Sequence, residues 1–172
     1  MPILRLLVLL GERMIHMSVR RTIQLTAEGV SRLQAELQQL EHSLLPELKQ
    51  RIQQATEDGD VNDNTEFDDL KEEFMQTEAR IRDIEQTLER AEVIAEGSVD
   101  GIIALGSHVT VRADDGEQET WVLVNAEEAD ALDGRISADS PLGRALVGIK
   151  SGDSAAVETP DGPITYTVVD VR

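Results

Sequence analysis

Carboxylate side chains crowd into one stretch of this 172-residue sequence, residues 57–69, which read EDGDVNDNTEFDD. Residues 57–73 hold nine acidic residues and one basic residue, Lys71. Because like charges this close repel one another, we expect something to compensate them. Clustered carboxylates are also ligands for divalent cations, so metal binding is the first chemistry to consider.

A calcium-binding EF-hand loop does not fit this stretch. Asp58, Asp60, Asn62 and Asp69 stand at positions 1, 3, 5 and 12 of such a loop, but position 6 is Asp63, where a Gly is needed. Position 12 is also Asp rather than the bidentate Glu. Magnesium suits the stretch better, because it keeps several waters and takes only one or two protein carboxylates. Two acidic side chains here could therefore hold half of a magnesium site that another protein completes, as in two-metal phosphoryl chemistry.

The rest of the chain offers little for catalysis. It has no Cys, which removes disulfides, thiolate metal sites and cysteine nucleophiles, and which fits a cytoplasmic protein. Its histidines, His16, His42 and His108, are far apart, and the sequence has neither a GxSxG motif nor a Gly-rich phosphate loop. We expect no self-sufficient active site and no tightly bound cofactor.

Two amphipathic helices flank the acidic stretch. In the first, apolar residues recur every three or four positions from Leu25 onward, at Val30, Leu33, Leu37, Leu40, Leu44, Leu48, Ile52 and Ala55. Thr26 is a suitable N-cap for this helix, and Glu28 places negative charge in its first turn. Pro46 removes a backbone hydrogen bond and predicts a kink rather than an end, since the apolar stripe continues beyond it.

The second helix carries a heptad seam, with apolar steps of three and four at Phe67, Leu70, Phe74, Thr77, Ile81, Ile84, Leu88, Ala91 and Ile94 or Ala95. Two such stripes bury each other most simply as an antiparallel hairpin. Arms of about 30 residues reach about 45 Å at 1.5 Å per residue, so the acidic stretch lies at the tip of a long rod. From the stripes alone, a coiled-coil spacer or dimerisation rod is the alternative, but such a rod does not need the crowded carboxylates.

Beyond residues 96–101 the pattern becomes that of strands. Residues 107–113 alternate before a DDG turn signal, residues 120–124 follow, and residues 155–159 and 164–171 flank PDGP, another turn signal. Residues 140–153 predict a turn, a short helix and a loop. The C-terminal half therefore predicts a small antiparallel α+β domain.

The charge of the chain limits its partners. The net charge is −18, with 20 acidic and 11 basic residues through Ser98 and 14 acidic and 5 basic residues from Val99 onward. Such acidity argues against binding nucleic acid through its phosphates, and four aromatic residues are too few for a base-stacking platform. Any role in nucleic-acid chemistry is expected to be indirect. The same even acidity predicts a monomer at low salt.

The first sixteen residues contain a short apolar run, residues 6–10, far below the roughly 20 residues that span a bilayer. No small-residue cleavage site of a secretory signal follows. We interpret residues 1–16 as a dispensable or upstream extension, with Met17 as the biological start, and expect no membrane association.

Four motifs, in this order, resemble the bacterial GreA/GreB transcript cleavage factors: LTAEGVSRLQAELQQL at 25–40, GDVNDNTEF at 59–67, EARIRDIEQTLERAEVI at 78–94 and SPLGRALVG at 140–148. The resemblance covers nearly everything from Thr22 to Arg172. It implies a coiled-coil hairpin over 17–97 and an FKBP-like docking domain over 98–172. It also implies a non-enzymatic partner of RNA polymerase.

In such factors the coiled coil enters the secondary channel of RNA polymerase while the C-terminal domain docks on the rim of that channel. Acidic tip residues help to hold the second magnesium ion at the catalytic centre of the polymerase. Backtracked nascent RNA is cleaved there, which rescues arrested complexes. The resemblance thus implies a cytoplasmic factor that contacts the RNA 3′ end only indirectly and shares Mg²⁺ with the polymerase.

The tip pattern of the family falls on Gly59, Asp60, Val61, Asn62, Asp63 and Asn64, with Glu66 and Phe67 as further tip support. Asp60 matches the principal metal-assisting acid, and Asp63 stands where the second acid is usually Glu. Asn62 lacks the usual charge. Phe67 replaces a Tyr and cannot donate a hydrogen bond. These departures favour, as the alternative, a homologue that occupies the same channel without cleavage and inhibits the polymerase.

In the C-terminal half, the polymerase-docking candidates are Ser140, Pro141, Leu142, Gly143 and Leu146. The simpler interpretation of this segment is packing, with Leu142, Ala145 and Leu146 against a sheet, and we favour packing combined with docking. A further alternative is an FKBP-like isomerase or chaperone with a coiled-coil arm. Such an isomerase would need an aromatic-lined cavity, for which only Trp121 and Tyr166 are present in this half.

Overall fold

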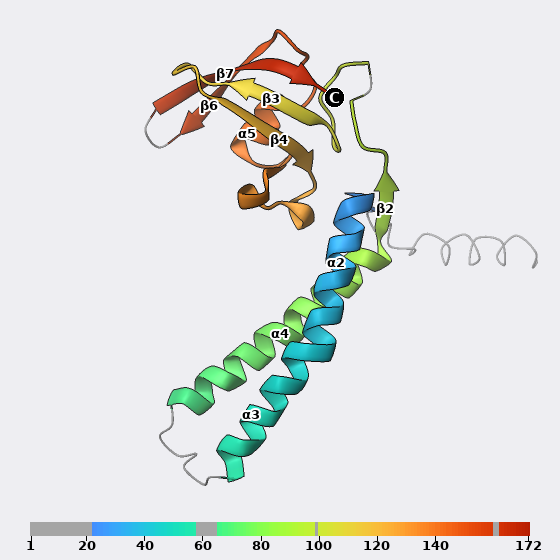
Figure 1. Ribbon diagram of the computed structural model, residues 1–172, viewed down its shortest axis with the longest axis vertical. Coiled ribbons are helices and arrows are strands. Elements are labelled where there is room, and N and C mark those ends of the chain that lie inside the picture. The colour runs from blue at the N-terminus through green and yellow to red at the C-terminus, as the bar shows by residue number, and fades with distance from the viewer. Residues whose placement is uncertain (1–21, 58–64, 99, 160–161) are drawn as a thin grey trace, which may run out of the picture.

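The computed structural model describes residues 22–57, 65–98, 100–159 and 162–172, which form a long helical rod and a curled β-sheet at one end of it (Figure 1). The rod has two antiparallel arms. The first arm comprises α2 (Ala27–Gln39), the π-helical turn η1 (Leu40–Leu44) and α3 (Leu45–Glu57), and the second is α4 (Thr65–Glu89). The helical hairpin predicted from the two stripes is confirmed.

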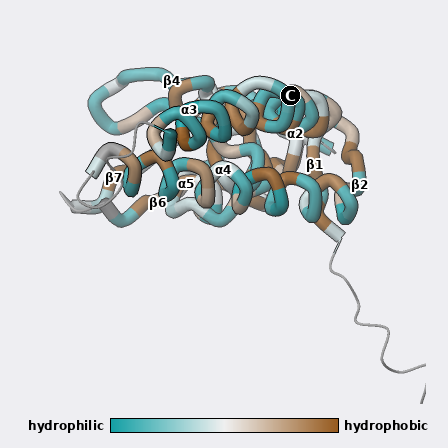
Figure 2. The backbone as a smooth tube through the Cα atoms, turned by 90° about the horizontal axis from the view of Figure 1, so that it is seen from below, coloured by the Kyte–Doolittle hydropathy of each residue, from teal (hydrophilic) through white to brown (hydrophobic). Residues whose placement is uncertain are grey.

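The arms are held together by the predicted apolar stripes. Seen from below, hydrophobic and hydrophilic residues alternate around the helical turns (Figure 2). Seven residues of the stripes are buried, namely Leu33, Leu48, Phe67, Leu70, Thr77, Ile81 and Ile84. Burying one large apolar side chain in this way stabilises the folded state by roughly 1.5–3 kcal/mol. The far end of the rod, where α3 ends and α4 begins, lies opposite the sheet (Figure 1).

The first arm continues past Pro46 as predicted, and the irregularity falls just ahead of the proline. Leu45 donates its backbone N–H to the carbonyl of Leu40, five residues back, which defines the π-helical turn η1. Pro46 has no N–H to give to the preceding turn. A wider turn at this point redistributes the remaining hydrogen bonds, and α3 then resumes ordinary helical geometry.

The base of the rod differs from the prediction, because both helices are shorter than their apolar stripes. Leu25 belongs to β1 (Ile23–Thr26), and the last seam residues belong to β2 (Ala91–Ile94). The two strands pair in parallel, with Ile23 opposite Ala91. The chain enters and leaves an antiparallel hairpin at the same end, so these segments meet and pair with each other, a contact that periodicity within either segment cannot reveal.

The C-terminal half is a five-stranded sheet in the order β5-β4-β3-β7-β6. Its strands are β3 (His108–Arg112), β4 (Gln118–Val124), β5 (Arg135–Ser137), β6 (Ser154–Thr159) and β7 (Gly162–Val171). Neighbours are antiparallel except β4 and β5, which run parallel. The α+β fold class is confirmed, with β5 as a strand that the sequence pattern did not indicate.

The core of this half lies between the sheet and α5 (Pro141–Leu146), where Ile103, Val109, Val111, Leu123, Leu146, Ala155 and Val168 are buried. Two short 3-10 helices, η2 (Ala126–Glu128) and η3 (Ala131–Asp133), connect β4 to β5. They lie between the sheet and the upper end of α2, so this connection joins the two halves of the molecule (Figure 1).

Candidate functional site

The predicted tip residues Gly59, Asp60, Asn62, Asp63 and Asn64 lie outside the described residues. The chain is described up to Glu57 at the end of α3 and again from Thr65 at the start of α4. Both of these ends lie at the end of the rod opposite the sheet (Figure 1). In the sequence, residues 58–64 stand between these two ends.

The described flank of the tip combines exposed acids with packed aromatic rings. Asp68 and Asp69 are exposed on the first turn of α4, whereas the ring of Phe67 is 7% exposed. Phe67 is therefore a buried residue of the apolar stripe on α4. The predicted tip-support role of Glu66 concerns a side chain outside the described residues.

Two lysines sit over the phenylalanine rings near the tip. The ammonium of Lys71 lies 4.0 Å from the ring centroid of Phe67 and 3.5 Å from a carboxylate oxygen of Asp68. The ammonium of Lys49 lies 5.8 Å from the ring centroid of Phe74. These cation–π contacts place positive charge beside the acidic end of the rod. Lys71 was the only basic residue noted in the sequence here, and Lys49 was missed because it lies on the other arm.

An ion pair ties the two arms together higher up the rod. The guanidinium of Arg80 on α4 donates from Nε and Nη2 to the two carboxylate oxygens of Glu36 on α2, at 2.7 and 2.9 Å. The hydrogen bond to Glu36 raises the pKa of Arg80, while burial acts in the opposite direction. This two-bond contact joins α2 and α4 directly.

The predicted docking segment contains α5, which is capped and packed against the sheet domain core. Ser140 caps the helix by accepting a hydrogen bond from the Gly143 N–H at 3.0 Å, and Pro141 occupies the first turn. A side chain at Gly143 would come within 2.0 Å of the carbonyl oxygen of Ser137. Leu146 is fully buried, and Leu142 and Ala145 pack partly against the same core, so the packing interpretation is confirmed.

That packing decides which docking candidates could meet a partner. Gly143 and Leu146 are buried, whereas Pro141 is exposed and Ser140 and Leu142 are half-buried. Docking by this segment stays a prediction.

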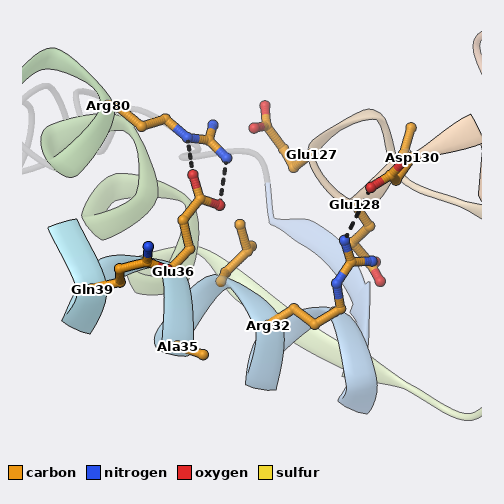
Figure 3. A pocket seen from close by; sticks show the side chains of 11 residues that line it. Arg32, Ala35, Glu36, Gln39, Arg80, Glu127, Glu128 and Asp130 are labelled. Carbon is orange, nitrogen blue, oxygen red and sulfur yellow. Dashed lines mark hydrogen bonds and ion pairs between the residues drawn. The ribbon is translucent and has the colours of Figure 1, made fainter. Parts of the chain in front are cut away.

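Two clefts in the described part of the chain have several carboxylates in their walls. One, of about 400 Å³, separates α2 and α4 from the η2–η3 connection; its walls include Arg32, Glu36, Arg80, Glu127 and Asp130 (Figure 3).

The other cleft, of about 360 Å³, is lined by Tyr166 together with Asp114, Asp115, Glu117 and Glu119. Burial, helped by Glu119 and Asp115, raises the pKa of Tyr166. This lining differs from the aromatic-lined cavity that an isomerase would need, because Tyr166 is its one aromatic residue.

Neither a metal cluster nor a membrane helix is found in the part of the chain that the structure describes. Within those residues, no group of three or more His, Asp or Glu side chains is placed to hold a metal ion. No helix there is long and apolar enough to cross a bilayer. The acids predicted to assist a metal, Asp60 and Asp63, lie outside the described residues.

The described residues thus form a long helical hairpin with a sheet domain as a base at one end. Comparison with known proteins assigns a chain of this build to a family. The family model described as "Transcription elongation factor, N-terminal" matches residues 23–93, and the model described as "Transcription elongation factor, GreA/GreB, C-term" matches residues 98–172.

Individual relatives agree. The chain is 43% identical over 150 residues to transcription elongation factor GreA of Chloroflexus aurantiacus, covering 86% of this chain and 96% of the relative. It is 39% identical over 154 residues to GreA of Thermosipho africanus, covering 89% and 98%. A solved structure, GreA factor homolog 1 of Thermus thermophilus, is 33% identical, with 88% and 99% coverage and a TM-score of 0.42.

The chain therefore belongs to the GreA/GreB family of transcription elongation factors, as the motifs had indicated. It is an accessory transcription factor rather than an enzyme itself. The two matched regions meet between residues 93 and 98. The division of the chain at residue 97, and the dispensability of residues 1–16, stay predictions.

Proposed function

We propose that this protein inserts its helical rod into the secondary channel of RNA polymerase and stimulates cleavage of backtracked nascent RNA by the polymerase itself. Cleavage leaves a new RNA 3′ end from which synthesis resumes. The observation that carries the proposal is the geometry of the rod in a member of this family. α3 ends and α4 begins at the end of the rod farthest from the sheet, and the acidic residues 58–64 stand between them in the sequence. We expect these acids to reach into a channel while the sheet domain stays outside.

In this proposal Asp60 and Asp63 act in trans. Carboxylate oxygens are ligands that Mg²⁺ accepts, and two of them leave most of its coordination positions for other groups. The two acids would help to hold a Mg²⁺ ion that the polymerase also binds, and that ion supplies charge stabilisation and water activation in phosphoryl chemistry. Lys49 and Lys71, held over phenylalanine rings, lessen the repulsion between the nearby acids.

The test is cleavage of end-labelled nascent RNA in backtracked complexes of the cognate polymerase. Wild-type protein should shorten the RNA in a Mg²⁺-dependent manner. Asp60→Ala with Asp63→Ala should lower the rate by about two orders of magnitude, at least the loss that removing outer-shell partners of a metal site causes. Asp69→Ala is the matched control, because it removes an exposed carboxylate from the adjacent helical turn. Binding to polymerase, measured by competition, should survive in all variants.

A second candidate function is inhibition from the same channel without cleavage. The residues that favour it are Asn62, Asp63 and Phe67, each of which departs from the family tip pattern. Asp is one methylene shorter than Glu, so the second carboxylate reaches less far. Slower nucleotide addition with no RNA shortening by the wild-type protein would support inhibition and overturn the cleavage proposal.

A further inference from the structure

The N-terminus of α2 has half of a capping box. Thr26, in extended conformation, is the N-cap, and its hydroxyl oxygen accepts a hydrogen bond from the Gly29 N–H at 2.9 Å. In a complete capping box, the third helical residue is Glu or Gln, and its side chain reaches back to the N–H of the N-cap residue. Here that position is Gly29, which has no side chain to offer.

Glu128, from the other half of the molecule, supplies the missing carboxylate. The Thr26 N–H donates to Oε1 of Glu128 at 2.9 Å, and the Thr26 hydroxyl donates to Oε2 at 2.5 Å. The two residues are 102 positions apart, and Glu128 is only 5% exposed. A carboxylate at this place also interacts favourably with the positive end of the helix dipole.

Gly29 makes room for that carboxylate. A Cβ atom built on Gly29 would lie 1.8 Å from Oε2 and 2.6 Å from Cγ of Glu128. The backbone of Gly29 is helical, a conformation that any residue adopts, and glycine weakens a helix interior. The glycine is therefore explained by space: the carboxylate of Glu128 occupies the position that a local side chain would take.

Ion pairs near this contact also join α2 to the C-terminal half. Arg135, 8% exposed, donates to Glu28 at 3.1 Å and to Asp133 at 2.7 Å. Arg32 lies 3.7 Å from Asp130, and Figure 3 shows its guanidinium directed towards the η2–η3 connection. The Arg32 pair is substantially exposed and contributes little. Glu128 and Arg135 are the buried charged residues in this region.

We infer that Glu128 is a latch that completes the capping box of α2 from the C-terminal half and thereby fixes the angle between the rod and the sheet. Because the contact joins η2 directly to the first turn of α2, a change in that angle has to break it. Glu128 is then a positioning residue for the distant tip, and this functional part of the inference rests on the proposed function.

The latch is tested by measuring the separation between a spin label on the rod and one on the sheet. The chain has no Cys, so Gln50→Cys on α3 and Gln118→Cys on β4, both exposed, provide the only attachment points. Double electron–electron resonance should give one narrow distance distribution for the otherwise wild-type protein. Glu128→Ala should increase the population at other separations at least about tenfold, as expected for losing a buried charge-assisted hydrogen bond.

Three further variants separate the latch from other causes. Glu127→Ala removes an exposed carboxylate one residue away and should leave the distribution narrow. Glu128→Gln keeps one acceptor oxygen and should give an intermediate width. Gly29→Glu installs a local capping box in the space of the latch, so it should broaden the distribution while circular dichroism shows the helical content unchanged. A distribution as narrow as wild type in both Glu128→Ala and Gly29→Glu would overturn the latch, as would equal broadening by Glu127→Ala.

The positioning role has its own readout in the RNA cleavage assay. Releasing the latch should raise the protein concentration for half-maximal cleavage about tenfold, because a rod of unfixed direction pays an orientation cost on binding. The maximal rate at saturation should stay near wild type, since the tip is unchanged. Loss of maximal rate with an unchanged half-maximal concentration would overturn the positioning role. A wild-type protein that cleaves no RNA would instead defeat the proposed function and leave the distance measurements valid.

Discussion

Phe67, which lies next to the acidic stretch in the sequence, is a packing residue of the rod. Its side chain is almost buried, and the ammonium of Lys71 lies over the ring. A residue that resembles a tip element in the sequence is therefore also a packing residue. The position can hold Phe in place of the family Tyr without loss of this apolar contact.

Truncating this ring should open the distal end of the rod. We expect Phe67→Ala to lower the free energy of unfolding by about 3 kcal/mol, through lost burial and the cavity left behind. Met75→Ala is the control on the same helix, since Met75 is 67% exposed and should change stability by less than about 0.5 kcal/mol. Urea unfolding followed by circular dichroism at 222 nm measures both, and similar midpoints for the two variants would contradict the packing role.

At the scale of elements, the rod depends on an apolar seam first and on its interarm ion pair second. The Arg80–Glu36 fork has good geometry, but both side chains are about 40% exposed. Solvent and salt therefore screen its electrostatic contribution. The packing of the apolar seam does not depend on salt in this way, so it should hold the arms together when salt weakens the ion pair.

The fork should thus contribute only modestly to stability. A double-mutant cycle with Glu36→Gln and Arg80→Gln should give a coupling free energy of about 0.5–1 kcal/mol at low ionic strength. The coupling should fall by more than half in 1 M salt, where the Debye length is about 3 Å. A coupling that does not respond to salt would show that Arg80 acts through packing of its side-chain stem instead.

At the scale of the whole molecule, the proposed function makes the length of the rod the dimension that decides activity. Removing seven residues from α3 and the seven facing residues from α4 keeps the heptad seam in phase and shortens the rod by about 10 Å. We expect this variant to bind RNA polymerase but to lose RNA cleavage, because its acids no longer reach the catalytic centre. Cleavage at the wild-type rate would show that the reach of the rod is not what limits activity.

The net charge of the chain predicts its state of association. With 18 net negative charges, two copies repel each other at low ionic strength, so sedimentation equilibrium in dilute buffer should give a monomer. A tight dimer would instead favour a dimerisation rod, the alternative that the stripes alone leave open.

Periodicity in the sequence was sufficient for the parts of the fold that each segment decides alone. The stripe from Val30 to Ala55 predicts a helix because its apolar face recurs with the helical period, and the Thr26 cap needs only a residue three positions away. The β3–β4 and β6–β7 hairpins and the helix α5 likewise follow from local alternation and turn residues.

Contacts between distant segments were decided only by the tertiary structure. The stripes continue to Leu25 and Ile94 in the sequence, yet these residues form paired strands because the hairpin brings its two ends together. The LTAEG stretch at the start of α2 shows the same limit. In the sequence Gly29 is only a residue that weakens a helix, whereas in the structure its missing side chain leaves space for the carboxylate of Glu128. Glu128 and its partner Thr26 are 102 residues apart, so no pattern within either segment predicts their contact. Only folding brings the two segments together.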